Sequence, residues 1–206
     1  MRTSLVPDIV VGRLPLYLRA LSQMQSDGRE ITSSQELGEK LGISSAQIRK
    51  DLSQFGEFGK QGTGYNIGYL TEQLKRILKV EQSWDVALIG VGDLGRAVAN
   101  YAGFLDRGFR VVAIYDNDPS KVGTRVGRFE IFDAADLAKD IRGKRIQVAM
   151  LAVPAEQAQS VTNLLVEAGI RAILCYAPTS VSVPKAVRVQ YIDPVLHLQR
   201  MTYYIS

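Results

Sequence analysis

The fold of the larger part of the chain is decided by the stretch Val86-Ala87-Leu88-Ile89-Gly90-Val91-Gly92-Asp93-Leu94-Gly95. Four apolar residues predict a buried strand, and a Gly-x-Gly-x-x-Gly motif follows directly. In this motif Gly90 allows a tight turn, Gly92 lets a pyrophosphate approach the backbone, and Gly95 lets the next helix pack closely on the sheet. Because the free N–H groups at the start of that helix bind phosphate, the stretch is typical of a dinucleotide-binding loop.

The residues after the glycine motif support this interpretation. A helical pattern starts at Leu94, and one face of it is made of Ala97, Val98, Tyr101 and Ala102. The apolar residues 111–115 then predict a second strand, which ends in Asp116 about twenty residues past the last glycine. An acid in this position suits a ribose 2′-hydroxyl. The order of strand, glycine loop, helix, strand and acid therefore predicts a dinucleotide site.

Strands and helices alternate along the rest of the chain. Further strands are predicted at residues 129–132, 148–153, 172–175 and 187–192, with helices ending at Ile141 and Ala168 between them. This alternation predicts an α/β domain of the Rossmann type, a doubly wound parallel sheet whose ligand crevice lies at the carboxyl ends of the strands. The residues expected at those ends are Gly90, Asp116, Val153, Pro154, Cys175, Tyr176, Ala177 and Pro178.

Composition bounds the class of protein. The chain has 206 residues, 46% of them hydrophobic and 22% charged, which predicts a globular core. No apolar run reaches the roughly 18 residues of a membrane span, and no His or Cys spacing suggests a metal site. A single cysteine, Cys175, excludes an intrachain disulfide and fits a reducing cytoplasm; we expect a buried structural thiol there.

Most of the net positive charge belongs to the first part of the chain. Residues 1–80 hold 11 Lys and Arg against 8 Asp and Glu, so they carry most of the net charge of +4. This balance is typical of a module that binds nucleic acid, although many inert surfaces are equally basic.

Helix start and stop signals in this part predict a helix-turn-helix. Ser33-x-x-Glu36 and Ser44-x-x-Gln47 each form a predicted capping box, and Gly42 between them is a helix stop. Two short capped helices joined by a glycine-containing turn are the arrangement in which the second helix enters the major groove of DNA.

The second of these helices has a face suited to DNA. Ile48 and Leu52 must point inward, which leaves small, amide and cationic side chains for base edges and phosphates. These candidate DNA-binding residues are Ser44, Ala46, Gln47, Arg49, Lys50, Ser53 and Gln54. Residues 56–67 then read as two short strands around a Gly-rich turn, with Lys60 near the tip. A hairpin after a recognition helix predicts a winged helix whose cationic tip contacts the DNA backbone.

Further helices flank the winged-helix elements. Pro15 either starts the first amphipathic helix or kinks it against a preceding turn, and Thr71 is expected to cap the helix that ends near residue 80. We therefore predict a winged-helix domain at residues 1–80, a Rossmann domain at 84–193 and a separate amphipathic helix at 194–206. The last helix packs either on its own domain or on a partner subunit.

The sequence offers no convincing reaction machinery. The one histidine, His197, lies on the terminal helix among leucines, whereas a dehydrogenase needs a proton relay beside its nicotinamide. A nucleotide site attached to a DNA reader, with no catalytic group, indicates a sensor rather than an enzyme.

Several stretches match one family. They are Arg13-Leu14-Pro15-Leu16-Tyr17-Leu18-Arg19, Gln47-Ile48-Arg49-Lys50-Asp51-Leu52-Ser53, Gly62-Thr63-Gly64-Tyr65, the glycine motif with Tyr101, Asp116-Asn117-Asp118-Pro119-x-Lys121-x-Gly123, Ala177-Pro178 and Ile192-Asp193. On these stretches the chain resembles, over nearly its whole length, the Rex family of bacterial redox-sensing transcriptional repressors.

The resemblance implies a homodimer with a domain-swapped C-terminal helix that binds NADH or NAD⁺ in competition at a site including Lys121. The NAD⁺ form would hold a palindromic operator, and the NADH form would leave it. The family pattern also implies a switch with two states. In one, Asp193 pairs with Arg19 and holds the DNA-binding domains in place; in the other, Asp193 accepts a hydrogen bond from Tyr101 and the DNA-binding domains are released.

Two other functions stay open at this point. A regulator that senses another nucleotide, such as a coenzyme A derivative, is the closer alternative, and an NAD-dependent dehydrogenase with an appended helical domain is the more distant one. Asp116 discriminates between the nucleotides, since its carboxylate suits an unmodified ribose hydroxyl pair and would repel a phosphorylated one.

Overall fold

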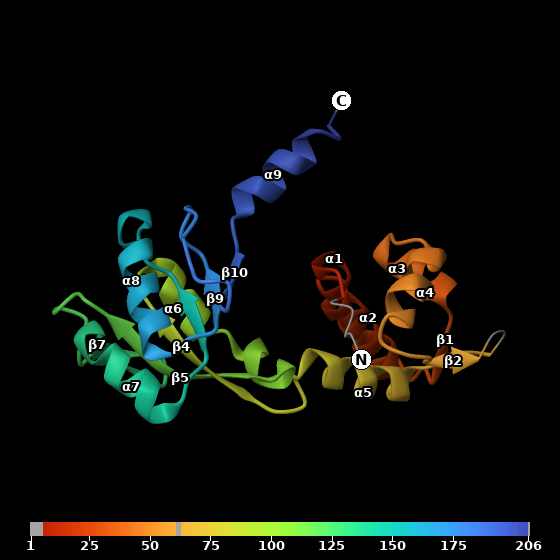
Figure 1. Cartoon of the computed structure of the whole chain (residues 1–206), viewed down its shortest axis with the longest axis horizontal. Helices are drawn as coiled ribbons and strands as arrows, with labels where there is room; N and C mark the ends of the chain where they lie inside the picture. The colour runs from red at the N-terminus through yellow and green to blue at the C-terminus, as the bar shows by residue number, and fades with distance from the viewer. Residues whose placement is uncertain (1–5, 61–62, 206) are drawn as a thin grey trace. The chain divides into compact units, whose positions relative to one another are not determined.

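The chain forms two compact units, with the boundary between Gln82 and Ser83 (Figure 1). The structure is a computed structural model that describes residues 6–60 and 63–205. Each unit has its own hydrophobic core.

The first unit is a winged helix. Its elements, in chain order, are α1 (Asp8–Val11), α2 (Leu14–Ser26), β1 (Ile31–Thr32), α3 (Ser34–Leu41), α4 (Ser45–Ser53), β2 (Gly59–Lys60), β3 (Gly64–Asn66) and α5 (Ile67–Leu78). The strands form an antiparallel sheet in the order β1-β3-β2. Strand β1, which the sequence analysis did not predict, adds a third strand to the expected hairpin.

Local signals set the helix ends of this unit in most places. Pro15 lies in the first turn of α2 and starts that helix rather than kinking it. Ser33 and Glu36 form the predicted capping box of α3, and Gly42 ends the helix with φ +67°. The second predicted box is only half formed: the Ser44 side chain accepts from the Gln47 amide, but the Gln47 side chain binds elsewhere.

One helix start was predicted wrongly. Helix α5 begins at Ile67, because the Asn66 side chain accepts a hydrogen bond from the Tyr69 amide at 2.8 Å and caps the helix five residues earlier than expected. Thr71, the predicted cap, is buried inside α5.

The second unit is a doubly wound α/β domain. Its elements are β4 (Trp84–Ile89), α6 (Asp93–Ala99), the 3₁₀ helix η1 (Ala102–Arg107), β5 (Phe109–Asp116), β6 (Arg125–Val126), β7 (Phe129–Asp133), η2 (Ala134–Asp136), α7 (Leu137–Lys144), β8 (Val148–Leu151), α8 (Ala155–Ala168), β9 (Ala172–Cys175), β10 (Arg188–Tyr191) and α9 (Pro194–Thr202). The predicted Rossmann class is therefore correct.

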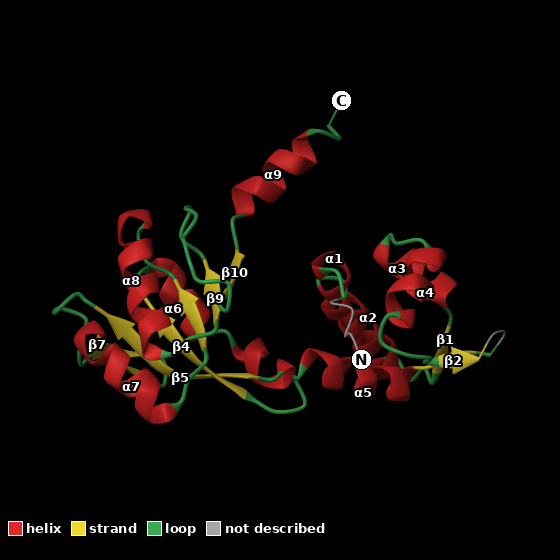
Figure 2. Cartoon of the chain, viewed as in Figure 1, coloured by secondary structure: helices red, strands yellow, loops and turns green. Residues whose placement is uncertain are grey.

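The sheet has the order β10-β9-β8-β4-β5-β7-β6 and is parallel except for the β6–β7 pair (Figure 2). Helices α7 and α8 cover a core on one face, and α6 with η1 covers a second core on the other. Strand β4 lies between β5 and β8. The strands that follow β4 directly in the chain are added on its β5 side, and those from β8 onward are added on its other side. Such a switch point opens a crevice at the carboxyl ends of the strands.

The expected helix after the glycine loop is shorter than predicted. Helix α6 ends at Ala99, and the Asn100 side chain donates to the Arg96 carbonyl at 3.0 Å. Tyr101 is extended and precedes η1, so Tyr101 and Ala102 do not continue the apolar face of α6. A polar side chain that bonds its own backbone competes with the helical ladder, which is the physical reason for the early end.

The glycine at the packing point of α6 gives a test of this fold. A Cβ at Gly95 would lie 2.0 Å from the Gly90 carbonyl oxygen, so Gly95→Ala must push α6 off the sheet. We expect it to destabilise the second unit by about 1–3 kcal/mol. Urea unfolding followed by the fluorescence of Trp84, the one tryptophan of the chain, measures this.

Gly143→Ala is the matched control, since a Cβ at Gly143 in α7 has open space around it. It should stabilise the same unit by about 0.5–1 kcal/mol through helix propensity. Equal unfolding free energies for Gly95→Ala and the wild type would contradict the close approach.

Candidate functional site

The glycine loop between β4 and α6 has the geometry of a phosphate cradle. Gly90 has φ +92°, and a Cβ there would lie 2.3 Å from the Ala152 carbonyl oxygen. Gly92 is the N-cap of α6, and nothing lies within 4 Å of the place where its Cβ would be. The open backbone at Gly92 and the start of α6 together favour an anionic ligand.

Asp116 ends β5 and holds this loop in place. Its carboxylate accepts hydrogen bonds from the Val91 amide at 2.8 Å and the Asp118 amide at 2.9 Å, and Lys121 Nζ lies 3.2 Å from Oδ2. Burial raises the pKa of Asp116, but these hydrogen bonds and the lysine outweigh burial and keep the pKa below its usual value. The buried carboxylate is therefore charged and fixed beside the glycine loop.

The strand order brings the other predicted nucleotide-binding residues to the same edge of the sheet. Val153 and Pro154 follow β8, and residues 176–178 follow β9, so they lie at the ends of neighbours of β4. Asp93 and Leu94 form the exposed first turn of α6. The loops after β9, β8, β4 and β5 therefore lie along one edge of the sheet, the edge at which doubly wound folds bind their ligands.

The side chains near the crevice offer little for catalysis. Cys175 is fully buried at the end of β9, and burial raises the pKa of its thiol. The thiol donates a hydrogen bond to the Ala177 carbonyl. His197 is exposed on α9. Among the described residues no cluster of His, Cys, Asp or Glu could hold a metal ion. The buried thiol expected from the sequence is present.

The recognition helix α4 carries an exposed polar face. Ala46, Lys50, Ser53 and Gln54 are exposed, and Ser44 caps the helix. Arg49 is exposed as well, and its guanidinium donates to Ser34 Oγ on α3 at 2.9 Å. Lys60 lies in β2, but its side chain is outside the described residues.

Gln47 differs from the other predicted DNA-binding residues. It is half-buried, and its side-chain amide donates to Asp51 Oδ1 at 2.7 Å.

Asp51 is a functional candidate that the sequence analysis missed. It is fully buried on α4 and also accepts from the Arg13 guanidinium at 2.7 Å and from the Tyr17 hydroxyl at 2.6 Å. The signal was present in the sequence, since Asp51 lies between the inward-facing Ile48 and Leu52. A carboxylate on the apolar side of a helix requires buried donors.

The environment keeps this acid charged. Burial raises the pKa of Asp51, but hydrogen bonds from Arg13, Tyr17 and Gln47 outweigh it and hold the pKa below its usual value. The pKa of Tyr17 is raised, first by burial and then by the hydrogen bond to Asp51, and the bond to Asp51 raises the pKa of Arg13. Asp51 thus ties α4 to α2 through a charged, buried contact.

The three residues implied as a switch have separate surroundings. Arg19 is exposed on α2. Asp193 is the N-cap of α9, and its side chain accepts from the Val195 amide at 2.9 Å. Tyr101 is 51% exposed and packs edge-on against Phe104, with ring centroids 5.0 Å apart.

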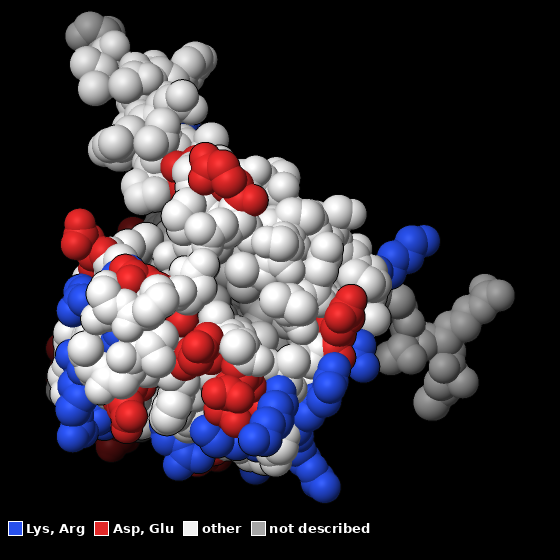
Figure 3. Space-filling view, turned by 90° about the vertical axis from the view of Figure 1, so that its left-hand side faces the viewer, with Lys and Arg blue, Asp and Glu red and all other residues white. Residues whose placement is uncertain are grey.

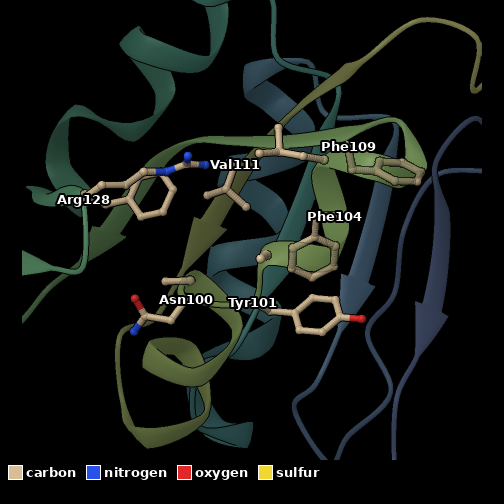
Figure 4. Close-up of a pocket in the computed structure, with 10 residues that line it drawn as sticks. Asn100, Tyr101, Phe104, Phe109, Val111 and Arg128 are labelled. Atoms are coloured by element: carbon tan, nitrogen blue, oxygen red, sulfur yellow. The ribbon is translucent and has the colours of Figure 1, made fainter.

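Tyr101 also lines a cavity of about 260 Å³ on the α6 side of the sheet. Phe104, Phe109, Val111 and Arg128 line it too (Figure 4). The cavity is lined mainly by apolar side chains, four of them aromatic, and none of its lining residues belongs to the glycine loop. Figure 3 shows one face of this unit, on which positively and negatively charged side chains lie beside one another.

The winged helix with its exposed recognition face, joined to a glycine loop of the dinucleotide-binding type, defines a nucleotide-responsive DNA-binding regulator. Two family models match: "Putative DNA-binding protein N-terminus" at residues 5–53 and "CoA binding domain" at residues 81–179.

Full-length relatives identify the family. The chain is 52% identical, over its whole length and 97% of the other protein, to the redox-sensing transcriptional repressor Rex of Chloroflexus aurantiacus, and 44% identical to that of Brevibacillus brevis over 98% of this chain and 97% of that one. The chain belongs to the Rex family of redox-sensing transcriptional repressors. Members of this family are regulators of transcription rather than enzymes.

Solved structures agree with this assignment. The crystal structure of RSP in complex with β-NAD⁺ and operator DNA is 35% identical, with a TM-score of 0.92 over 98% of this chain and 93% of that chain. RSP in complex with β-NADH is 33% identical, with a TM-score of 0.90 over 98% and 95%.

The lowered pKa of Asp51 predicts a pH effect on stability. The carboxylate stabilises the folded state fully above its unfolded pKa of about 3.9, and this contribution is lost as the pH falls through the lower folded pKa. The reference is the double variant Arg13→Gln/Asp51→Asn, which removes both charges. We expect the wild type to lose stability relative to this variant below about pH 4.

Urea unfolding followed by far-ultraviolet circular dichroism, at several pH values between 3 and 7, measures the difference. Other acids titrate in both proteins and cancel. A difference in unfolding free energy that stays constant over this range would show that Asp51 does not titrate as described.

Proposed function

We propose that the chain is a transcriptional repressor that senses the NADH/NAD⁺ ratio. It binds operator DNA when NADH is low and leaves the DNA when NADH binds. The observation that carries this proposal is the presence, in one chain of the Rex family, of an exposed recognition helix and of a glycine loop closed by a buried acid. The similar protein RSP has been crystallised with β-NADH, and with β-NAD⁺ and operator DNA.

The nucleotide site consists of the loops at the strand ends. Residues 90–95 hold the pyrophosphate, and Asp116 accepts from the ribose hydroxyls, with Lys121 beside it. The loops after β8 and β9 enclose the nicotinamide part. They contribute Val153, Pro154, Tyr176, Ala177 and Pro178.

The DNA surface consists of α4 and the wing. Lys50 is exposed without an ion pair among the described residues, so it is available for a base or phosphate contact. Ala46, Ser53 and Gln54 lie beside it on the same face, Ser44 and Gln47 lie at the start of the helix, and Arg49 and Lys60 contact the DNA backbone.

The active form is a homodimer that reads a palindromic operator in the cytoplasm. Helix α9 supports this proposal, because none of its residues is buried and Val195, Leu196, Leu198 and Met201 are each more than half exposed. An apolar helix without cover in its own unit requires another surface. We propose that residues 194–206 swap onto the partner subunit, leaving residues 84–193 as the nucleotide domain. No described helix is long and apolar enough to cross a membrane.

A coenzyme A derivative is the second candidate ligand, since the matching family model of the second unit carries that description. The charged Asp116 disfavours it, because a phosphorylated ribose would bring a like charge against a carboxylate that is only 6% exposed.

Nucleotide binding tests the proposal. Calorimetry should show that NADH binds far more tightly than NADPH and coenzyme A. Asp116→Ala should weaken NADH binding by about 10-fold or more, since it removes a charge-assisted hydrogen bond, and should relax the preference over NADPH. Asp118→Ala is the matched control, because the Asp118 backbone amide still donates to Asp116.

The readout on DNA uses duplexes that the protein selects, with NAD⁺ present, from a randomised pool. Adding NADH should release these duplexes from the wild type. Selection of no sequence, or release by coenzyme A in place of NADH, would overturn the proposed function.

Redox state reaches the DNA, we propose, through an exchange of partners by Asp193. In this proposal an Asp193–Arg19 ion pair holds the DNA-binding domains in the position that binds the operator. A hydrogen bond from Tyr101 to Asp193 replaces that ion pair and releases the domains from the operator. A charge-assisted bond contributes roughly 1.5–3 kcal/mol, and switching from 1:99 to 99:1 needs about 5.5 kcal/mol. Two such exchanges of partner, one in each subunit of a dimer, together supply a free energy close to the one that full switching needs. The exposure of Arg19 and Tyr101 leaves both side chains available.

The switch predicts that Tyr101→Phe keeps NADH binding but needs more NADH to release the operator. Asp193→Ser keeps a cap for α9 but removes the carboxylate, so its DNA affinity should depend little on either nucleotide. Titration of both variants with NADH on the selected duplex measures this. Release curves that overlay the wild type would eliminate the mechanism.

A further inference from the structure

The carboxylate of Asp51 has its hydrogen-bonding capacity filled. Oδ1 accepts from Arg13 and Gln47, and Oδ2 accepts from Arg13 and Tyr17. Two of these donors come from the start of α2, whereas Gln47 belongs to the first turn of α4 itself. The acid therefore connects the α2 anchor to a side chain at the edge of the DNA-facing surface.

This contact fixes which way the Gln47 amide points. A carboxylate only accepts hydrogen bonds, so Gln47 must turn its NH₂ group toward Asp51 and its carbonyl oxygen away. The distance of 2.7 Å from Gln47 Nε2 to Asp51 Oδ1 uses one amide hydrogen. The carbonyl oxygen and the second hydrogen remain, and no donor to that oxygen is recorded among the described residues.

The position of Gln47 makes these two groups useful. The N-terminal residues of a recognition helix contact base edges in the major groove, and Gln47 is three residues past the N-cap Ser44. A glutamine that offers one acceptor and one donor matches adenine N6 and N7. A rotating amide would present either end, whereas one held by Asp51 presents a single pattern.

Net stabilisation of the fold alone does not explain the buried ion pair between Arg13 and Asp51. A buried salt bridge often contributes little net stability, because desolvation offsets the attraction between its charges. The Asp51 side chain is 0% exposed, while Arg13 retains 20%. Besides this pair, Asp51 holds the side-chain amide of Gln47, the third residue that donates to it.

We propose that Asp51 is a positioning residue that orients Gln47 to read one adenine in each half-site of the operator. This inference rests on the proposed function as an operator-binding repressor. Asp51 touches no base in this scheme and acts through the amide of Gln47.

The experiment is a specificity profile with NAD⁺ present. The probe is the duplex that the wild type selects from a randomised pool, together with all single-base-pair changes within one half-site. We expect Gln47→Ala to lose discrimination at one adenine position by roughly 5- to 150-fold, the range of a bidentate base contact. The salt dependence should stay unchanged, because no phosphate contact is removed.

Two further variants separate positioning from stability. Asp51→Asn frees the Gln47 amide to turn around, so it should relax preference at the same position. If this variant does not fold, Arg13→Gln/Asp51→Asn removes both charges and leaves no unpaired buried ion. Tyr17→Phe is the matched control: it removes a bond to Oδ2 but leaves the Gln47 contact to Oδ1, so the profile should keep its shape.

The outcomes distinguish this inference from the proposed function. Failure of the wild type to select any sequence contradicts the repressor function itself. A wild type that selects DNA, with Gln47→Ala keeping full discrimination at every position, overturns the adenine contact. A loss of discrimination in Gln47→Ala but not in the Asp51 variants overturns the positioning role.

Discussion

The close approach of α6 to β4 is the constraint on which the nucleotide-binding unit depends. Gly95 lies against the Gly90 carbonyl with no room for a Cβ, and this packing aims the first turn of α6 at the crevice. The Val91 amide, between these glycines, donates to Asp116 at the end of β5. One turn thereby joins the neighbouring strands β4 and β5, and the N–H groups that we propose to bind phosphate are held by the same contacts that hold the sheet.

Each of the two units holds a buried carboxylate in its charged form, but the hydrogen-bond donors to that carboxylate differ between the units. Asp116 and Asp51 are both buried carboxylates whose pKa values are lowered despite burial. Backbone amides supply most of the bonds to Asp116, so that site depends on chain geometry and tolerates side-chain change nearby. Side chains supply the bonds to Asp51, and two of these residues, Arg13 and Tyr17, are distant in the chain, so the orientation of α4 depends on them. The first arrangement suits a loop that must fit a common ligand, and the second suits a surface that must read sequence.

Local signals explain how much could be predicted from the sequence. The glycine motif with its flanking strands predicted the Rossmann class and the edge at which the crevice lies, because strand order at a switch point follows from topology. The capping box at Ser33 fixed α3. Competing local bonds caused the errors: Asn66 caps α5 ahead of Thr71, and Asn100 ends α6 before Tyr101. Two donors to Asp51, Arg13 and Tyr17, lie 38 and 34 positions away in the chain, so no local pattern indicated them.

The acids of the chain differ in how easily their hydrogen-bond partners could be exchanged. Asp51 and Asp116 are each bound by several donors in buried surroundings, and any change of partner would leave an unpaired buried charge. Asp193 holds only the first turn of α9, and a cap contributes about 1 kcal/mol, which a charge-assisted bond to another partner can replace. A sensor needs reading surfaces that keep their shape and joints that change contacts at low cost. Buried, saturated acids meet the first need, and in the proposed switch the half-exposed Asp193 at the start of α9 meets the second.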